Sequence, residues 1–195
     1  AGIDGLFIIS PWVFLFLIPA VTMRLFAEEY RLGTMAILKT KPLSDTQIVL
    51  GKALAGITLS LIAIVPTLIY YLSVYLLGES TGNIDSGGTF GSYIGLLFLA
   101  ASYVSMGLFA SSLSDNPIIA FLIGMFICFI FFYGFDQLAS IFPSSATQLF
   151  VMSLGINEHY ISMSRGVIDT RDLIYFISLI TLFSLLTREV VKKRV

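Results

Sequence analysis

The sequence predicts an all-α membrane protein, a bundle of helices that crosses the bilayer several times. Three observations predict this class. The 195-residue chain is 57% hydrophobic, only 12% of its residues are charged, and its apolar residues gather in five long runs. A run of about 18 apolar residues is long enough to cross the hydrocarbon core as a helix. Soluble domains are far more polar, so we expect a single membrane domain over residues 1–195.

Each expected span carries its own local signals. The first has no charged residue, and Pro19 is expected to kink its end. Pro66 lies in the middle of the second span and predicts a bend there. Small residues at four-residue spacing in the third span, among them Gly95, Gly107 and Ser111, predict close packing against a neighbouring helix. The five spans cover residues 6–23, 53–77, 91–113, 117–135 and 173–187.

A polar segment at residues 24–44 follows the first span. Its apolar residues recur at three- and four-residue intervals, which predicts an amphipathic helix. Gly33 is expected to divide this helix into two, and Ser44 with Gln47 forms a capping-box pattern that starts the next helix. Lys52, at the edge of the second span, is expected to extend toward the lipid headgroups.

The distribution of Lys and Arg predicts which side of the membrane each end faces. Nine of the eleven lie in the polar segment, at Lys52 or after residue 187. The positive-inside rule places both groups in the cytoplasm, together with the C-terminus, and five crossings that start outside agree with this. The stretch 78–91, with two acids and no base, is expected outside, as are two short helices over residues 137–161.

The sequence lacks the residues that most chemistry requires. It contains no phosphate-binding loop, no dinucleotide-binding glycine motif and no metal-ligand cluster, so neither an enzyme nor a bound cofactor or metal is expected. His159 is expected to be packed or solvated, and Cys128 to be packed. The bases form no array for nucleic acid. No charged residue lies in the middle of a span, which disfavours a carrier with its own ion sites.

Such a bundle needs energy from elsewhere, and the polar segment is a candidate input. A soluble motor that grips this segment could tilt the two spans that it connects. The alternative interpretation is a helix that lies along the lipid headgroups. Helical spacing alone does not choose between the two.

The run PWVFLFLIPAVTMRLFAEEYRLGTMAILKTKPLSDTQIVLGK resembles the signature of ABC-2 type transporter permeases. The shared features are Pro-x-x-Thr-Met-Arg at the end of a span, an acidic pair, Gly-Thr, Lys-Thr-x-Pro-Leu-Ser and Gln-Ile-Val-x-Gly-Lys. Within that family the chain is similar to gliding-motility-associated permease subunits of Bacteroidetes. This likeness continues through PTLIYYLSVYLLG, GSYIGLLFLAASYVSMGLFASSLSDNPIIAF and FFYGFDQLAS.

The resemblance implies a bacterial inner-membrane subunit with six spans, so the family's first span is expected upstream of residue 1. It implies three kinds of partner: a separate ABC ATPase that binds ATP and Mg, a second permease subunit, identical or related, and membrane lipids. It also implies that the ATPase engages a coupling helix in the polar segment. The residues that match the family's motif there are Glu28, Glu29, Arg31, Gly33 and Thr34.

Two functions are therefore considered. The first is the permease subunit of an ATP-driven exporter that works by alternating access and is associated with gliding motility. The second is a non-transporting scaffold or mechanotransmission subunit that couples ATP hydrolysis to a motility or secretion complex. Movement of a cargo across a reconstituted membrane distinguishes the two.

Overall fold

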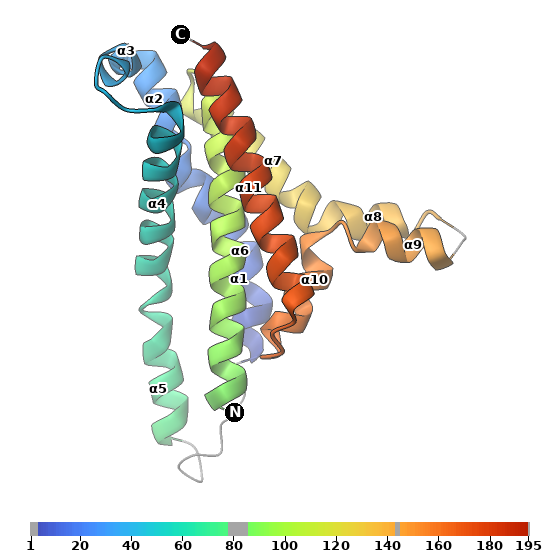
Figure 1. Cartoon of the computed structure of the whole chain (residues 1–195). Coiled ribbons are helices and arrows are strands. Elements are labelled where there is room, and N and C mark those ends of the chain that lie inside the picture. The colour runs from blue at the N-terminus through green and yellow to red at the C-terminus, as the bar shows by residue number, and fades with distance from the viewer. Residues whose placement is uncertain (1–3, 78–85, 143–144, 195) are drawn as a thin grey trace.

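The computed structural model describes residues 4–77, 86–142 and 145–194, and all the regular elements among them are helices (Figure 1). The predicted all-α class is confirmed. In chain order the elements are α1 (Asp4–Thr22), α2 (Arg24–Leu32), α3 (Thr34–Lys39), α4 (Asp45–Ile64), α5 (Thr67–Leu77), α6 (Ser86–Leu113), α7 (Pro117–Phe129), the π-helical turn η1 (Ile130–Gly134), α8 (Phe135–Ala139), α9 (Ser145–Met152), α10 (Ile156–Ser164) and α11 (Thr170–Lys193).

Five helical stretches of the described chain are long and apolar enough to cross a membrane, as the sequence predicts. Most of the apolar side chains on their outer faces remain exposed, which suits a lipid environment. The chain is therefore a multi-pass membrane protein. The five stretches are Asp4–Leu32, Asp45–Leu76, Ser86–Leu113, Pro117–Ala139 and Thr170–Lys193.

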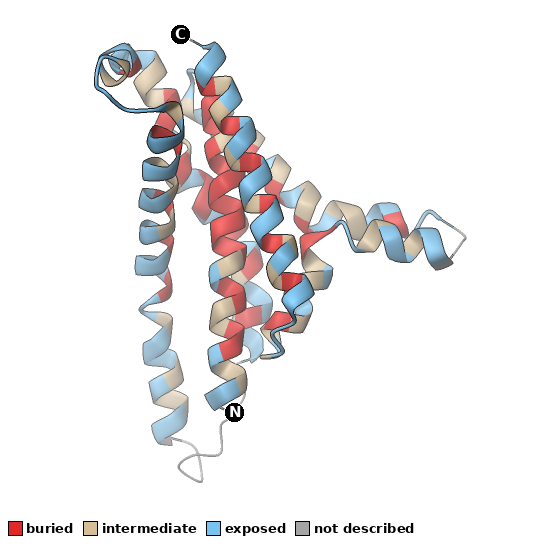
Figure 2. Ribbon diagram, viewed as in Figure 1, coloured by how far each residue is buried: buried red, intermediate tan, exposed pale blue. Residues whose placement is uncertain are grey.

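Helix α6 is the centre of the bundle. It packs against α1, α4, α7, α10 and α11, and Figure 2 shows buried residues along most of its length. Small residues allow its neighbours to approach closely. A Cβ added to Gly95 would lie 2.6 Å from the Cβ of Met163, and one added to Gly107 would lie 2.1 Å from Oγ1 of Thr22. The small-residue pattern of the third span is thus a helix-packing surface.

The bundle has two ends, and Figure 1 shows which elements lie at each. The end that holds α2, α3, the start of α4 and the end of α11 is called the basic end. The opposite end, called the distal end, holds the starts of α1 and α6 and the turn after α10. At the distal end, Gly91 of α6 lies so close to Gly166 that an added Cβ would stand 2.7 Å from the Gly166 carbonyl oxygen.

The prolines act in two different ways. Helix α1 continues through Pro19 and ends at Thr22, so the expected kink takes the form of a boundary with α2. The amide of Met23 still donates to the Pro19 carbonyl at 2.9 Å, which keeps α1 and α2 nearly continuous. Pro66, in contrast, separates α4 from α5, as predicted for the second span.

Several predicted boundaries differ from the structure. Residues 78–85 of the expected external stretch lie outside the described residues, whereas residues 86–91 form the first turns of α6. The fourth helical stretch continues past residue 135 to Ala139 because η1 adds a π turn without ending the helix. The last helix, Thr170–Lys193, exceeds the predicted span at both ends. Hydropathy marks only the apolar part of a helix, while backbone hydrogen bonding continues into polar residues.

The helices in the stretch 137–161 differ in how closely they pack against the bundle. Helix α10 packs against α6 and ends at Ser164, beyond the predicted limit. Helices α8 and α9, here called the α8–α9 arm, project sideways from the bundle in Figure 1. Of the two short helices predicted there, one (α10) packs inside the bundle and the other (α9) lies outside it.

Candidate functional site: the α2–α3 segment

The α2–α3 segment is a pair of short helices joined at a glycine corner. Helix α2 buries Phe26 and Ala27, and α3 buries Met35. Gly33 adopts a left-handed conformation with φ of 71°, and its N–H donates to the carbonyl of Tyr30 at 3.2 Å. A residue with a side chain is disfavoured in that conformation. The predicted division at Gly33 is confirmed.

Ser111 of α6 caps the start of α2 from across the bundle. The residue before α2 is Met23, whose side chain has no oxygen that could accept from the first N–H groups of the helix. The Ser111 hydroxyl instead accepts from the N–H groups of Phe26 at 3.0 Å and Ala27 at 3.1 Å, and it donates to the carbonyl of Met23 at 2.8 Å. The first N–H groups of a helix have no acceptor within that helix, so this contact fixes α2 to α6.

Lys52 joins the segment to α4. Its ammonium group lies 2.6 Å from the Glu29 carboxylate, donates to the carbonyl of Leu25, and stands 4.8 Å from the centre of the Phe26 ring. Only 14% of the side chain is exposed. The expectation that Lys52 extends toward the headgroups is wrong, because a carboxylate, a carbonyl and an aromatic face bind it within the fold.

Two further cations join the segment to α11. The guanidinium of Arg194 lies 4.6 Å from the centre of the Tyr30 ring and donates to the carbonyl of Ser112 at 2.9 Å. From α3, the ammonium of Lys39 donates to the carbonyl of Val191 at 2.9 Å, in the last turn of α11. A cation at that position complements the negative end of the helix dipole. The segment is therefore bonded to α4, α6 and α11.

The structure separates the five residues that the resemblance predicts for coupling to an ATPase. Glu29 turns inward to Lys52. Glu28 and Arg31 form an accessible pair 3.3 Å apart on the outer side of α2. Gly33 and Thr34 form the exposed corner, where the Thr34 hydroxyl donates to the Glu29 carbonyl at 3.4 Å. Four of the five thus remain reachable from outside, while Glu29 holds the segment in place.

Two other features of this segment were not predicted. Leu32 and Ile37 are each 64% exposed, although they lie on a segment rich in charge. A small groove of about 260 Å³ lies between α2 and the start of α7, beside Glu28 and Arg31. Exposed apolar side chains rimmed by polar ones are typical of surfaces that contact another protein or the membrane.

These features define an all-α, multi-pass membrane protein with one polar helical segment bonded into its bundle. Among its described residues, no group of three or more His, Cys, Asp or Glu could hold a metal ion. Residues 3–188 match the family described as ABC-2 family transporter protein, and the chain belongs to that family. Proteins of this family are membrane components that work with an ABC ATPase. No match was found among curated proteins.

Proposed function

We propose that the chain is the membrane-spanning subunit of an ATP-driven exporter, and that the α2–α3 segment receives the motion of a separate ABC ATPase. One observation carries this proposal: the inner side of the segment is bonded to α4, α6 and α11, while its outer side is exposed. A displacement of the outer side would reach three helices of the bundle through short polar contacts. The ATPase, rather than this chain, would bind ATP and Mg.

The remaining parts of the proposal concern assembly and orientation. Two permease subunits, identical or related, would form the transport pathway and alternate its access. The basic end would face the cytoplasm of a bacterial inner membrane, since it holds nine of the eleven Lys and Arg residues. The resemblance to permeases associated with gliding motility supports a part in that process.

The docking test changes the outer side of the segment and leaves its inner contacts intact. In the Leu32→Glu, Ile37→Glu double variant, two carboxylates replace exposed apolar side chains. We expect the amount of co-purified ATPase, identified by its phosphate-binding loop and ATP hydrolysis, to fall roughly tenfold or more. Leu113→Glu makes the same change at the end of α6 and should leave co-purification unchanged. Equal recovery with all three proteins would remove the coupling role.

The orientation test uses cysteine labelling in intact cells. The native Cys128 is buried and gives a low background. A cysteine at Thr34 should react with a membrane-impermeant maleimide only after permeabilisation, and one at Ser86 should react without it. Labelling of the Thr34 position from outside would reverse the proposed orientation.

Reconstitution with the ATPase tests transport itself. Movement of a cargo that depends on ATP would support the exporter. ATP hydrolysis that responds to the permease without movement of any cargo would favour the scaffold function instead. The Leu32→Glu, Ile37→Glu variant serves as the uncoupled control in both measurements.

A further inference from the structure

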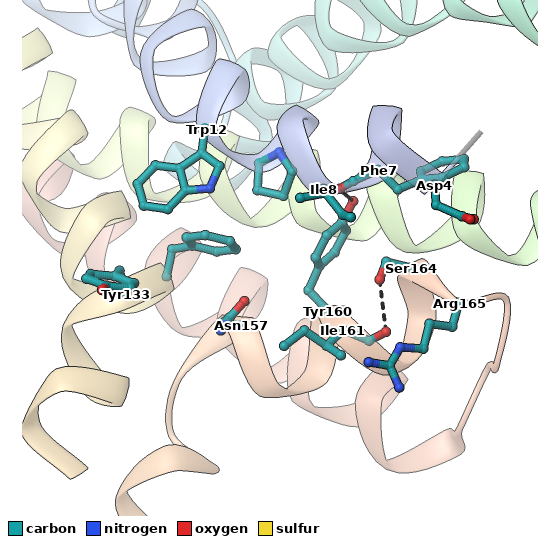
Figure 3. Close-up of a pocket in the computed structure, with 12 residues that line it drawn as sticks. Asp4, Phe7, Ile8, Trp12, Tyr133, Asn157, Tyr160, Ile161, Ser164 and Arg165 are labelled. Carbon is teal, nitrogen blue, oxygen red and sulfur yellow. Dashed lines mark hydrogen bonds between the residues drawn. The ribbon is translucent and has the colours of Figure 1, made fainter. Parts of the chain in front are cut away.

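A pocket of about 620 Å³ lies toward the distal end of the bundle, between α1, η1 and α10 (Figure 3). Its walls are mostly apolar and aromatic, with Phe7, Ile8 and Trp12 on one side and Phe132 on another. The rings of Trp12 and Phe132 meet edge to face, with their centroids 5.6 Å apart. This volume lies within the range of roughly 300–1,000 Å³ that is typical of ligand sites.

The polar groups inside the pocket are bonded within the protein. The Tyr160 hydroxyl donates to a backbone carbonyl of α1 at 2.8 Å, and burial raises the pKa of this phenol, which keeps it a neutral donor. The Ser164 hydroxyl donates to the carbonyl of Ile161 at 2.9 Å, and the Asn157 amide donates to the Asp136 carboxylate at 2.6 Å. A ligand in the interior therefore needs few polar groups, because the polar side chains of the pocket already have partners. A hydrocarbon chain meets this requirement.

Two residues of opposite charge lie at one end of the pocket. Figure 3 shows Asp4 and Arg165 on the side away from Trp12. Both are exposed, and within the described part of the chain neither side chain forms an ion pair or a hydrogen bond. The pocket thus combines mostly apolar walls with one positive and one negative group at one end.

We propose that this pocket binds one acyl chain of a zwitterionic phospholipid that carries a primary amine. The chain would lie against Trp12 and Phe132, the phosphate near Arg165 and the ammonium near Asp4. A guanidinium binds phosphate through paired N–H groups, and a carboxylate binds an ammonium. An anionic lipid would satisfy Arg165 but would bring its phosphate close to Asp4. The site goes beyond the exporter function, because binding requires no ATPase.

Trp12 is the single tryptophan of the chain, so all tryptophan fluorescence comes from a residue that lines this pocket. The purified protein in micelles of a neutral sugar detergent is titrated with phospholipids that carry brominated acyl chains, which quench tryptophan on contact. Brominated phosphatidylethanolamine should quench in a saturable way and at a lower lipid fraction than brominated phosphatidylglycerol.

Variants at the charged end test the headgroup contacts. Because both charges are exposed, Arg165→Gln and Asp4→Asn should each raise the phosphatidylethanolamine fraction at half-quenching about two- to fivefold. Arg171→Gln removes an exposed charge outside the pocket and should change nothing.

Three results would overturn the proposal. Quenching that is unsaturable and equal for both headgroups would show that Trp12 faces bulk lipid. Stronger quenching by phosphatidylglycerol would show an anion site instead. Absence of quenching by either lipid would show that another part of the protein fills the pocket. None of these results depends on whether the α2–α3 segment binds an ATPase.

Discussion

The α2–α3 segment and the α8–α9 arm are both pairs of short helices, yet they are attached to the bundle in different ways. Lys52 of α4 and Ser111 of α6 bond to the α2–α3 segment, and Arg194, which follows α11, lies over its Tyr30 ring. Helix α9 packs against α8, and its Leu149 and Phe150 side chains are each 66% exposed. A displacement of the α2–α3 segment must therefore move the bundle, whereas the arm can move with less effect on it.

How firmly each region is attached to the bundle depends on a few polar contacts between residues that are far apart in the sequence. The arm has contacts of this kind at its base, where α9 turns into α10. One nitrogen of His159 lies 2.7 Å from the Asp172 carboxylate, and the other lies 3.0 Å from the Ser153 carbonyl. The Tyr175 hydroxyl also donates to the carbonyl of Leu154 at 2.7 Å. These bonds hold the root of the arm and leave its tip exposed.

The largest expected difference between the two regions concerns close packing. In Gly107→Ala the new Cβ would clash with the Thr22 hydroxyl oxygen, so either the Thr22 side chain must rotate and lose its bond to the Ile18 carbonyl, or α1 and α6 must separate at the basic end. We expect a loss of about 2–3 kcal/mol of stability, measured as a lower midpoint of thermal unfolding in detergent. Gly134→Ala is the matched change at the base of the arm, where the nearest atom would lie at an ordinary 3.5 Å. A similar midpoint for both variants would contradict the difference in packing.

A smaller effect is expected from the cap that Ser111 provides. Ser111→Ala leaves the buried N–H groups of Phe26 and Ala27 without their acceptor, which should cost about 1–2 kcal/mol. Hydrogen exchange of the α2 amides should accelerate. Ser112→Ala is the control, because the Ser112 hydroxyl donates only to the Phe109 carbonyl one turn back in its own helix. If both variants leave α2 exchange unchanged, α2 is held by other contacts.

The helix break and the helix caps of this fold could be predicted because each depends on a few adjacent residues. The break at Gly33 and the capping box of Ser44 with Gln47 are confirmed. Asn116 and Asp169 cap α7 and α11 with their own side chains in a similar way. In each cap the side chain and the backbone N–H group from which it accepts lie within three residues of each other.

The contacts that build the candidate site could not be predicted in the same way. Ser111 lies 85 positions from Phe26, and the small-residue pattern indicated only that Ser111 faces a neighbouring helix. Helical spacing gives the face on which a side chain lies, but not the height and rotation of the helix that it meets. His159 was expected to be packed or solvated. It is packed against Tyr175, but its bond to Asp172 depends on how α10 meets α11.

The smallest expected effect is local to the root of the arm. His159→Phe keeps a ring stacked on Tyr175, where the centroids are 3.9 Å apart, but it removes both polar contacts of the imidazole. The Asp172 carboxylate is buried and loses its partner, so the root should loosen by about 1 kcal/mol. Amides of residues 145–156 should then exchange about fivefold faster, while the unfolding midpoint changes little.

Glu158→Gln, one position away on the exposed side of α10, is the control for His159→Phe and should leave exchange in the arm unchanged. The amides of α2 and α3 should also keep their exchange rates in His159→Phe, because the contacts that fix them come from Ser111, Lys52 and Arg194 at the other end of the bundle. Faster exchange in α2 and α3 together with the arm would mean that the two regions open as one unit. The α2–α3 segment and the α8–α9 arm would then not move independently, despite their different attachment to the bundle.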